Sequence, residues 1–211
     1  MPASGSRCHH AIRLWLPDRP GALGAVASRI GAVGGDVVGI EIVERESGVA
    51  VDELVVELPR AADLVLLVRE IGAVDGVRVE QVREVEGIVD GRLEALDAAG
   101  QLAEAAPAAV AERLAVILRT TLSADWVAVL GTDPARVVAR EGALPDDGWL
   151  HAFVAGRLSD ERAGAAGGEE IVALPLGRGL AVALARGALP FRPREVEIAR
   201  RLGRLACARL D

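Results

Sequence analysis

The stretch that decides the fold runs from Ile12 to Ile42 and begins Ile12-Arg-Leu-Trp-Leu-Pro-Asp-Arg-Pro-Gly-Ala-Leu23. It ends with Gly34-Gly-Asp-Val-Val-Gly-Ile-Glu-Ile42. The pattern predicts a strand, a tight turn over residues 18–21, a short amphipathic helix and a second strand. In the helix, the apolar positions follow the i, i+3, i+4, i+7 spacing of a buried stripe made of Leu23, Val26, Ala27, Ile30 and Val33.

Both ends of this helix carry local signals. Asp18 is a candidate N-cap, and Pro20 falls in the first turn, where its missing N–H costs nothing. Gly34-Gly35 ends the helix, because glycine adopts the left-handed conformation without a Cβ clash. The alternation after it predicts a half-buried strand with Val38, Ile40 and Ile42 on one face.

The residues around this stretch complete a small α+β unit. The pattern predicts a first strand over 9–16, a hairpin turn over 45–48, a third strand over 49–58, a helix over 61–73 and a closing strand over 77–86. The resulting order is β-α-β-β-α-β, the split ferredoxin-like arrangement. Trp15 points away from the apolar face of its strand and is a candidate for a domain or subunit contact.

An apolar strand, then Asp18-Arg-Pro-Gly-Ala-Leu23, then a helix closing on Gly34-Gly-Asp-Val37, resembles the opening half of an ACT domain. ACT domains are small regulatory modules that bind amino acids in many metabolic enzymes and regulators. The resemblance covers residues 9–86. It implies a ferredoxin-like βαββαβ fold and an amino-acid site where two such domains of a homodimer pair edge to edge.

The resemblance also implies the residues of that site. They lie on the turn after the first strand and at the start of the second: Asp18, Arg19, Pro20, Gly21, Ala22, Leu23, Gly35, Asp36 and Val37. The fold of the family brings the positions of Asp18 and Asp36 together beside the dimer interface. Many ACT domains have asparagine at both positions, which hold the amino and carboxyl groups of the ligand.

Aspartate at both positions changes the chemistry. A carboxylate accepts hydrogen bonds from an ammonium group but cannot donate one to a carboxylate. Backbone N–H groups at the helix start, around residues 21–23, could take that second role. The alternative is that Asp18 only caps the helix and Asp36 only stabilises the turn after Gly35.

Three further residues carry both a ligand-binding and a structural interpretation. Arg19 is either a solvated turn residue or a salt-bridge partner for a ligand carboxylate. A side chain at Gly21 would obstruct the approach of the backbone in either case. Asp52 resembles the strand-3 acid in ACT domains of nitrogen-regulatory proteins and shares a strand face with Leu54. It therefore lines a pocket or lies at the sheet edge.

The rest of the chain predicts a second α/β domain over residues 107–211, after a partly helical linker over 87–106. The order is a helix, two strands, a middle section, two strands and a helix that opens at Pro190-Phe-Arg-Pro-Arg-Glu195. This order resembles a compact GAF domain, an antiparallel sheet flanked by its first and last helices. In that family the middle section builds the ligand pocket. Here it spans only 142–169, which argues against a ligand in this half.

Composition limits the classes of function. The formal charge is −7, and every one of the 24 basic residues is arginine, so lysine nucleophiles and a phosphate-loop lysine are excluded. The acidic balance argues against nucleic acid, including at the arginine-rich last helix, where Glu195 and Glu197 indicate a solvated face. Cys8 and Cys207 provide no disulfide framework, and no apolar run is long enough for a membrane. We therefore expect a cytoplasmic protein.

The sequence offers no catalytic, metal or cofactor constellation. Cys8, His9 and His10 are neighbours on a predicted strand, so their side chains point to opposite faces and cannot share one ion. There is no Gly-x-Ser-x-Gly elbow, and Gly177-Arg-Gly179 fits a hairpin turn. We expect a non-enzymatic, allosteric regulator without a cofactor that binds an amino acid. The alternative is an interaction or dimerisation scaffold that has lost its ligand and regulates a protein partner.

Overall fold

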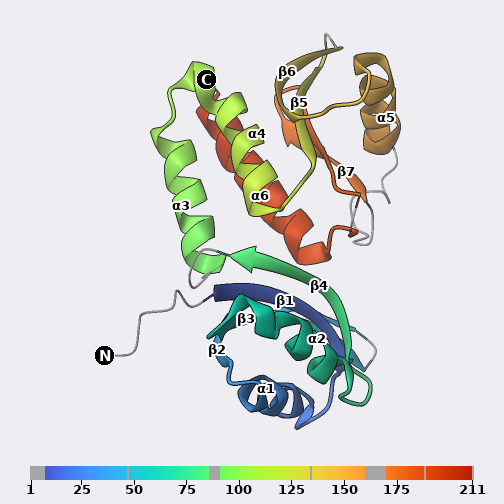
Figure 1. Cartoon of the computed structure of the whole chain (residues 1–211). Helices are drawn as coiled ribbons and strands as arrows, with labels where there is room; N and C mark the ends of the chain where they lie inside the picture. Colours follow the sequence, from blue (N-terminus) through green and yellow to red (C-terminus); the bar gives the residue numbers. More distant parts are fainter. Residues whose placement is uncertain are drawn as a thin grey trace. The chain divides into compact units, whose positions relative to one another are not determined.

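The computed structural model describes residues 8–46, 48–85, 91–133, 135–159, 170–187 and 189–210. The chain divides into two compact units, Met1–Gly91 and Arg92–Asp211. Each unit is built on one four-stranded antiparallel sheet with helices packed against it (Figure 1). The predicted α+β class is confirmed. Ser47 of the predicted hairpin turn, the start of the 87–106 segment and the end of the middle section over 142–169 lie outside the described residues.

The first unit has the predicted βαββαβ order. Its elements are β1 (Cys8–Pro17), α1 (Ala22–Ala32), β2 (Asp36–Glu46), β3 (Val49–Leu58), a 3₁₀ turn η1 (Ala61–Asp63), α2 (Leu64–Gly72) and β4 (Arg78–Val85). The strands are ordered β2-β3-β1-β4, so β2 and β4 are the edges of the sheet. Helices α1 and α2 lie side by side on one face of the sheet (Figure 1). The ferredoxin-like prediction is confirmed.

The core of this unit lies between that sheet face and the two helices. The strands contribute alternate residues and the helices contribute one stripe each; the fully buried side chains include Ile12, Leu14, Leu54, Val56, Leu58, Val26, Ile30, Leu67 and Ile71. The stripe predicted for α1 is wrong at one position, since Ala27 is exposed. The helix instead buries Ala22, one turn before Val26.

The ends of α1 are set by glycines. The N-cap residue is Gly21, at φ +89°, and no side chain caps the helix, so the N-cap prediction for Asp18 is wrong. A Cβ at Gly21 would meet no atom, so the left-handed backbone rather than lack of space explains this glycine. At Gly35 space is the reason, because a Cβ there would lie 3.0 Å from Leu58 Cδ2 and 3.1 Å from Ile30 Cγ2.

The second unit is built of α3 (Gly91–Glu104), η2 (Pro107–Ala109), α4 (Val110–Thr121), β5 (Trp126–Thr132), β6 (Ala135–Gly142), α5 (Asp147–Ser159), β7 (Ile171–Gly177), β8 (Leu180–Ala185) and α6 (Pro193–Arg209). Its strands are ordered β6-β5-β8-β7. Helices α4 and α6 cover one face of this sheet, and α5 covers the other (Figure 1). Helix α3, within the segment expected to be a linker, buries Ala98 and Leu102 in this unit.

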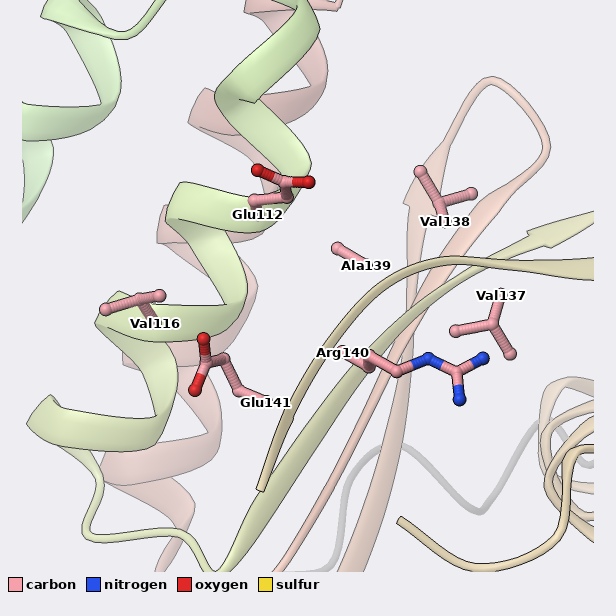
Figure 2. A pocket seen from close by; sticks show the side chains of 7 residues that line it. All are labelled: Glu112, Val116, Val137, Val138, Ala139, Arg140 and Glu141. Atoms are coloured by element: carbon pink, nitrogen blue, oxygen red, sulfur yellow. The ribbon is translucent and has the colours of Figure 1, made fainter. Parts of the chain in front are cut away.

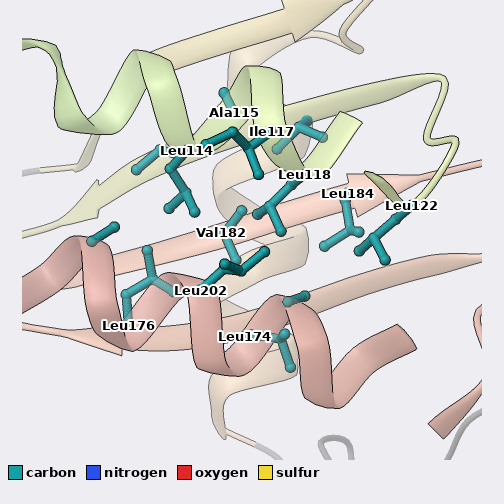
Figure 3. Close-up of a cluster of buried hydrophobic side chains, with 14 of the residues drawn as sticks. Leu114, Ala115, Ile117, Leu118, Leu122, Leu174, Leu176, Val182, Leu184 and Leu202 are labelled. Carbon is teal, nitrogen blue, oxygen red and sulfur yellow. The ribbon is translucent and has the colours of Figure 1, made fainter. Parts of the chain in front are cut away.

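Two apolar layers hold the second sheet. The larger layer packs α4 and α6 against the strands, with Leu114, Leu118, Val182, Leu184 and Leu202 near its centre (Figure 3). In the smaller layer, Leu150 and Val154 of α5 cover a face of small side chains: Ala128, Ala173, Ala181 and Ala183. The GAF-like arrangement expected from the sequence is therefore present, and α5 fills its second face with its own side chains.

Candidate functional site

Asp18, one of the predicted site residues on the β1–α1 turn, contacts the β2–β3 hairpin through its backbone and its side chain. The backbone N–H of Asp18 donates to the carbonyl of Gly48 at 2.9 Å. The Asp18 carboxylate lies 3.8 Å from Nε of Arg45, near the end of β2. The turn itself is exposed over residues 18–21. One part of the candidate site is therefore an exposed turn, where the carboxylate of Asp18 lies close to the guanidinium of Arg45.

Asp52 extends this arrangement into the interior. It lies on β3 directly between Leu14 of β1 and Ile42 of β2, and the residue is only 4% exposed. Its Oδ1 atom is fully buried and has no hydrogen-bond partner. Burial raises the pKa of the Asp52 carboxyl group, the charge of Arg45 lowers it, and the charge of Asp18 raises it. We call these three residues the Asp18–Arg45–Asp52 cluster.

The start of α1 lies beside this turn. Ala22 is buried and Leu23 half-buried, and the N–H of Ala22 donates to the carbonyl of Arg19. Because no side chain caps the helix, its first N–H groups keep the partial positive charge of a helix N-terminus without a side-chain acceptor. Arg19 is exposed and lies 4.0 Å from Asp75, so it has a weak partner in the loop between α2 and β4.

The other predicted site residues lie at the far end of the sheet. Asp36 is the first residue of β2 and pairs with Glu57, while the residue before Asp18 on β1, Pro17, pairs with Val49. Val49 and Glu57 are separated by most of β3, roughly 26 Å at about 3.3 Å per residue. Within one chain the structure thus keeps Gly35, Asp36 and Val37 apart from the turn residues 18–23. The predicted meeting of Asp18 and Asp36 does not occur inside a single chain.

Strand β2, which links the two ends, is an edge strand with apolar side chains on its surface. Ile40 is 56% exposed and Ile42 is 45% exposed. They pair with Leu54 and Asp52 of β3, on the helix-covered face of the sheet. The helices do not reach over them. An edge of this kind carries backbone groups that can pair with another strand.

The opposite face of the first sheet carries a polar network rather than a site. Glu53 binds Arg13 at 3.0 Å and Arg83 at 2.7 Å. Trp15 donates its Nε1–H to Glu80, and the guanidinium of Arg78 lies 5.1 Å from the centre of its ring. The predicted role of Trp15 in a domain or subunit contact stays a prediction.

Sequence reasoning missed Arg45. The sheet register shifts between Ile42 and Glu44, which changes the facing of the residues after the irregularity. Simple alternation of Ile40, Ile42 and the charged residues that follow gives no signal of this shift. The irregularity, together with the hydrogen bond between Asp18 and Gly48, is what brings a guanidinium to the turn.

The structure also describes a shallow groove on the second unit, with a volume of about 380 Å³. Figure 2 shows Glu112 and Val116 of α4 on one side of it and residues 137–141 of the edge strand β6 on the other. Arg140, one of the lining residues, pairs with Asp147 of α5 at 3.3 Å. The groove follows the sheet edge and does not enter the alanine-rich face under α5. It gathers no catalytic constellation.

The described part of the chain contains neither a metal-binding cluster nor a membrane-spanning helix. No group of three or more His, Cys, Asp or Glu side chains is placed there to hold a metal ion. His9 lies 3.3 Å from Glu57, whereas His10 points to the other face of β1 and is buried. None of the described helices is both long enough and apolar enough to cross a bilayer.

The comparison with known proteins gives a family match within the first unit. Residues 10–76 match the family model of the ACT domain. No curated protein matches the chain. Among solved structures, the ACT domain of a GTP pyrophosphokinase from Chlorobium tepidum is 18% identical, with a TM-score of 0.31, over 38% of this chain and 100% of that one.

Two other solved structures are similar over more of the chain. A bacteriophytochrome from R. palustris is 14% identical, with a TM-score of 0.46, over 81% of this chain and 47% of that one. A putative glycine cleavage system transcriptional repressor is 10% identical, with a TM-score of 0.32, over 89% of this chain and 81% of that one. The family match and the βαββαβ topology together establish that the first unit of this chain is an ACT domain.

Proposed function

We propose that this protein is a non-enzymatic regulator that binds a free amino acid between the ACT domains of two copies of the chain. The observation that carries the proposal is the open edge of β2. This strand runs from Asp36 at one end of the sheet to Arg45 near the other and exposes Ile40 and Ile42 between them. A site that uses both ends of β2 is incomplete in one copy.

Antiparallel pairing of two β2 strands would complete it. In such a pair each strand runs opposite to its neighbour, so the Asp36 end of one copy lies beside the Arg45 end of the other. Each Asp36 then approaches the Asp18–Arg45–Asp52 cluster of the partner copy, and two equivalent sites form. Pairing also satisfies the open backbone groups of the edge and removes Ile40 and Ile42 from water.

The chemistry of these sites suits a zwitterion. Asp18 and Asp36 accept hydrogen bonds from an ammonium group, and the predicted residues Gly35 and Val37 position Asp36 at the strand start. The N-terminus of α1, at Gly21, Ala22 and Leu23, and the guanidinium groups of Arg19 and Arg45 attract a carboxylate. Pro20 fixes the backbone of the turn. A ligand that prefers the paired arrangement shifts the population of copies towards it, which is the allosteric output.

The test is a thermal-shift and calorimetric screen of the purified chain against the twenty amino acids, with light scattering to follow its oligomeric state. A ligand present at about 100 times its Kd should stabilise the folded state by about 2.7 kcal/mol. We expect one or a few amino acids to raise Tm, and the shift to disappear in Asp18→Ala and in Asp36→Ala. Asp147→Ala, which alters an exposed carboxylate on α5 of the second unit, is the matched control and should keep the shift.

A scaffold that has lost its ligand is the second candidate. It is favoured by the two aspartates, which lack the hydrogen-bond donors of asparagine, and by α5, whose Leu150 and Val154 fill the second face of the GAF-like sheet. A chain that pairs through β2 but shows no Tm shift with any amino acid at millimolar concentration would decide for the scaffold. In either case we place the protein in the cytoplasm, where the thiols of Cys8 and Cys207 would stay reduced.

A further inference from the structure

We propose that Asp52 binds the ammonium group of the amino acid and that Arg45 acts as an internal cation, a positive charge from the same chain that takes the place of this ammonium. Without ligand, Arg45 neutralises Asp18 and Asp52. On binding, its guanidinium turns from these two carboxylates to the carboxylate of the ligand. This inference rests on the proposed function and deepens it. It assigns the ligand class as molecules that carry a primary ammonium and a carboxylate close together. It also assigns a role to a strand-3 residue and a hairpin residue that both lie outside the predicted set of residues 18–23 and 35–37.

Asp52 is a buried carboxyl group with an unsatisfied oxygen atom. The residue is 4% exposed, its Oδ1 is fully buried without a partner, and its neighbours across the strands are Leu14 and Ile42. Burial of an ionised carboxylate without a hydrogen-bonded partner is strongly unfavourable. Such a group either takes up a proton or binds a cation. An incoming ammonium, with three N–H donors, satisfies it directly.

The Asp18–Arg45–Asp52 cluster contains more acidic groups than basic ones. Two carboxylates face one guanidinium, so one negative charge is left uncompensated when both acids are ionised. An ammonium group supplies the missing charge. A ligand with only a carboxylate would add a second uncompensated charge, so the cluster selects against simple carboxylic acids.

Arg45 is only loosely held. Its side chain is 59% exposed, and its only ion pair among the described residues is the 3.8 Å approach of Nε to Asp18. Arg45 is therefore placed to neutralise the cluster in the unliganded chain, and its largely exposed side chain can turn its guanidinium to a bidentate contact with a ligand carboxylate.

The experiment measures the binding of two kinds of probe to four proteins. The probes are the twenty amino acids and, as the isolated cationic group, methylammonium. The proteins are the wild-type chain, Asp52→Asn and Arg45→Gln, with Asp147→Asn as the control. We expect Asp52→Asn to weaken every amino acid that binds wild type by about tenfold or more, since a charge-assisted hydrogen bond is lost. Arg45→Gln should weaken the same amino acids yet tighten methylammonium, because the competing internal cation is gone.

The outcomes separate the two proposals. Amino acids that bind wild type and Asp52→Asn with equal affinity would overturn the role of Asp52 and leave the proposed function standing. If Arg45→Gln weakens amino acids and methylammonium alike, the internal-cation role of Arg45 is wrong. If no amino acid binds the wild-type chain, both proposals fail.

A second measurement covers a variant that does not fold. On the wild-type chain, amino-acid affinity should fall as the pH is lowered through the raised pKa of Asp52, because protonation removes the charge that holds the ammonium. The charged groups that act on Asp52 are Arg45 on β2 and Asp18 on the turn, while Leu14 and Ile42 are apolar. An affinity that does not change over the acidic range would contradict the assignment.

Discussion

Asp18 and Asp36 lie at opposite ends of the same sheet, although only α1 separates them in the chain. The cause is topological. Both β1 and β2 are antiparallel to β3, so they run parallel to each other, and α1 carries the chain back along the sheet between them. The end of β1 and the start of β2 are then necessarily far apart. Any ligand that touches both aspartates has to lie between two copies of the chain.

This separation predicts complementation between two inactive variants. In a mixture of Asp18→Ala and Asp36→Ala chains, a mixed dimer has one site with both substitutions and one site with neither. Random mixing makes about half of the dimers mixed, so about a quarter of all sites should bind the amino acid again. Calorimetric stoichiometry after unfolding and refolding the mixture measures this. Binding that stays absent in the mixture would show that both aspartates act within one chain.

The open edge of β2 predicts that a charge there prevents pairing. Ile40→Lys should shift the chain towards the monomer, because a lysine on an edge strand opposes pairing with another strand. Val65→Lys is the matched control, since Val65 of α2 is 80% exposed and distant from the edge. Light scattering over a dilution series measures both. If the two variants dissociate equally, β2 is not the interface.

The contribution of the Asp52 carboxyl group to the free energy of unfolding should fall as the pH rises. Its folded-state pKa is raised above the unfolded value of 3.8, so the folded chain holds its proton longer than the unfolded chain does. Stability from this group is complete below pH 3.8 and is lost as the pH rises through the raised pKa. Asp52→Asn should therefore be more stable than wild type at neutral pH, with the difference vanishing in acid. Urea unfolding across this range measures it.

This pH profile also distinguishes a binding role from a structural one. A carboxylate that held the fold together would make Asp52→Asn less stable at neutral pH. A carboxylate kept for a ligand makes the unliganded variant more stable and the ligand weaker. The two readings differ in the sign of one free-energy difference.

Much of the first unit could be predicted from sequence because its signals are local. The strand alternation from Ile12 to Leu16, the helix stripe at Val26 and Ile30, and the glycines that follow are all read within a few residues. The N-cap prediction failed at Asp18 because the backbone at Gly21 is left-handed and starts the helix later. The position of Arg45 could not be predicted, because it depends on a register shift in β2 and on the hydrogen bond between Asp18 and Gly48, which are far apart in the chain.

Substitution of Gly35 should create a packing defect, whereas substitution of Gly24 in α1 should not. Gly35→Ala places a methyl group 3.0 Å from Leu58 and 3.1 Å from Ile30, so one of these core side chains has to move. We expect a loss of about 1–3 kcal/mol in the free energy of unfolding. Gly24→Ala, in α1 with no atom within 4 Å of the new methyl, should instead be about 0.5–1 kcal/mol more stable. Urea denaturation measures both, and two losses of equal size would contradict the packing argument.

The buried pair Arg186–Glu195 predicts a large loss of stability in the second unit when one partner is removed. The guanidinium of Arg186 donates to both oxygens of Glu195, at 3.0 and 2.6 Å, and also to the carbonyls of Leu122, Leu189 and Pro190. The pair thereby ties the end of β8 to the start of α6. Arg186→Ala leaves the Glu195 carboxylate buried without its cation, which should cost about 3–5 kcal/mol.

Glu197 of the same helix provides the control for this pair. It binds Arg200 and Arg201 at the surface, where water screens the charges, so Glu197→Ala should change the unfolding free energy only slightly. Tryptophan fluorescence in a Trp15→Phe background measures the unfolding of the second unit, because the two remaining tryptophans, Trp126 and Trp149, both lie in that unit. Replacing both buried partners, as Arg186→Met with Glu195→Leu, should cost less than Arg186→Ala alone, because no unpaired charge remains. A double variant less stable than the single one would show that the other contacts of Glu195, such as the hydrogen bond that it accepts from the Arg192 N–H, rather than its ion pair with Arg186, hold this junction.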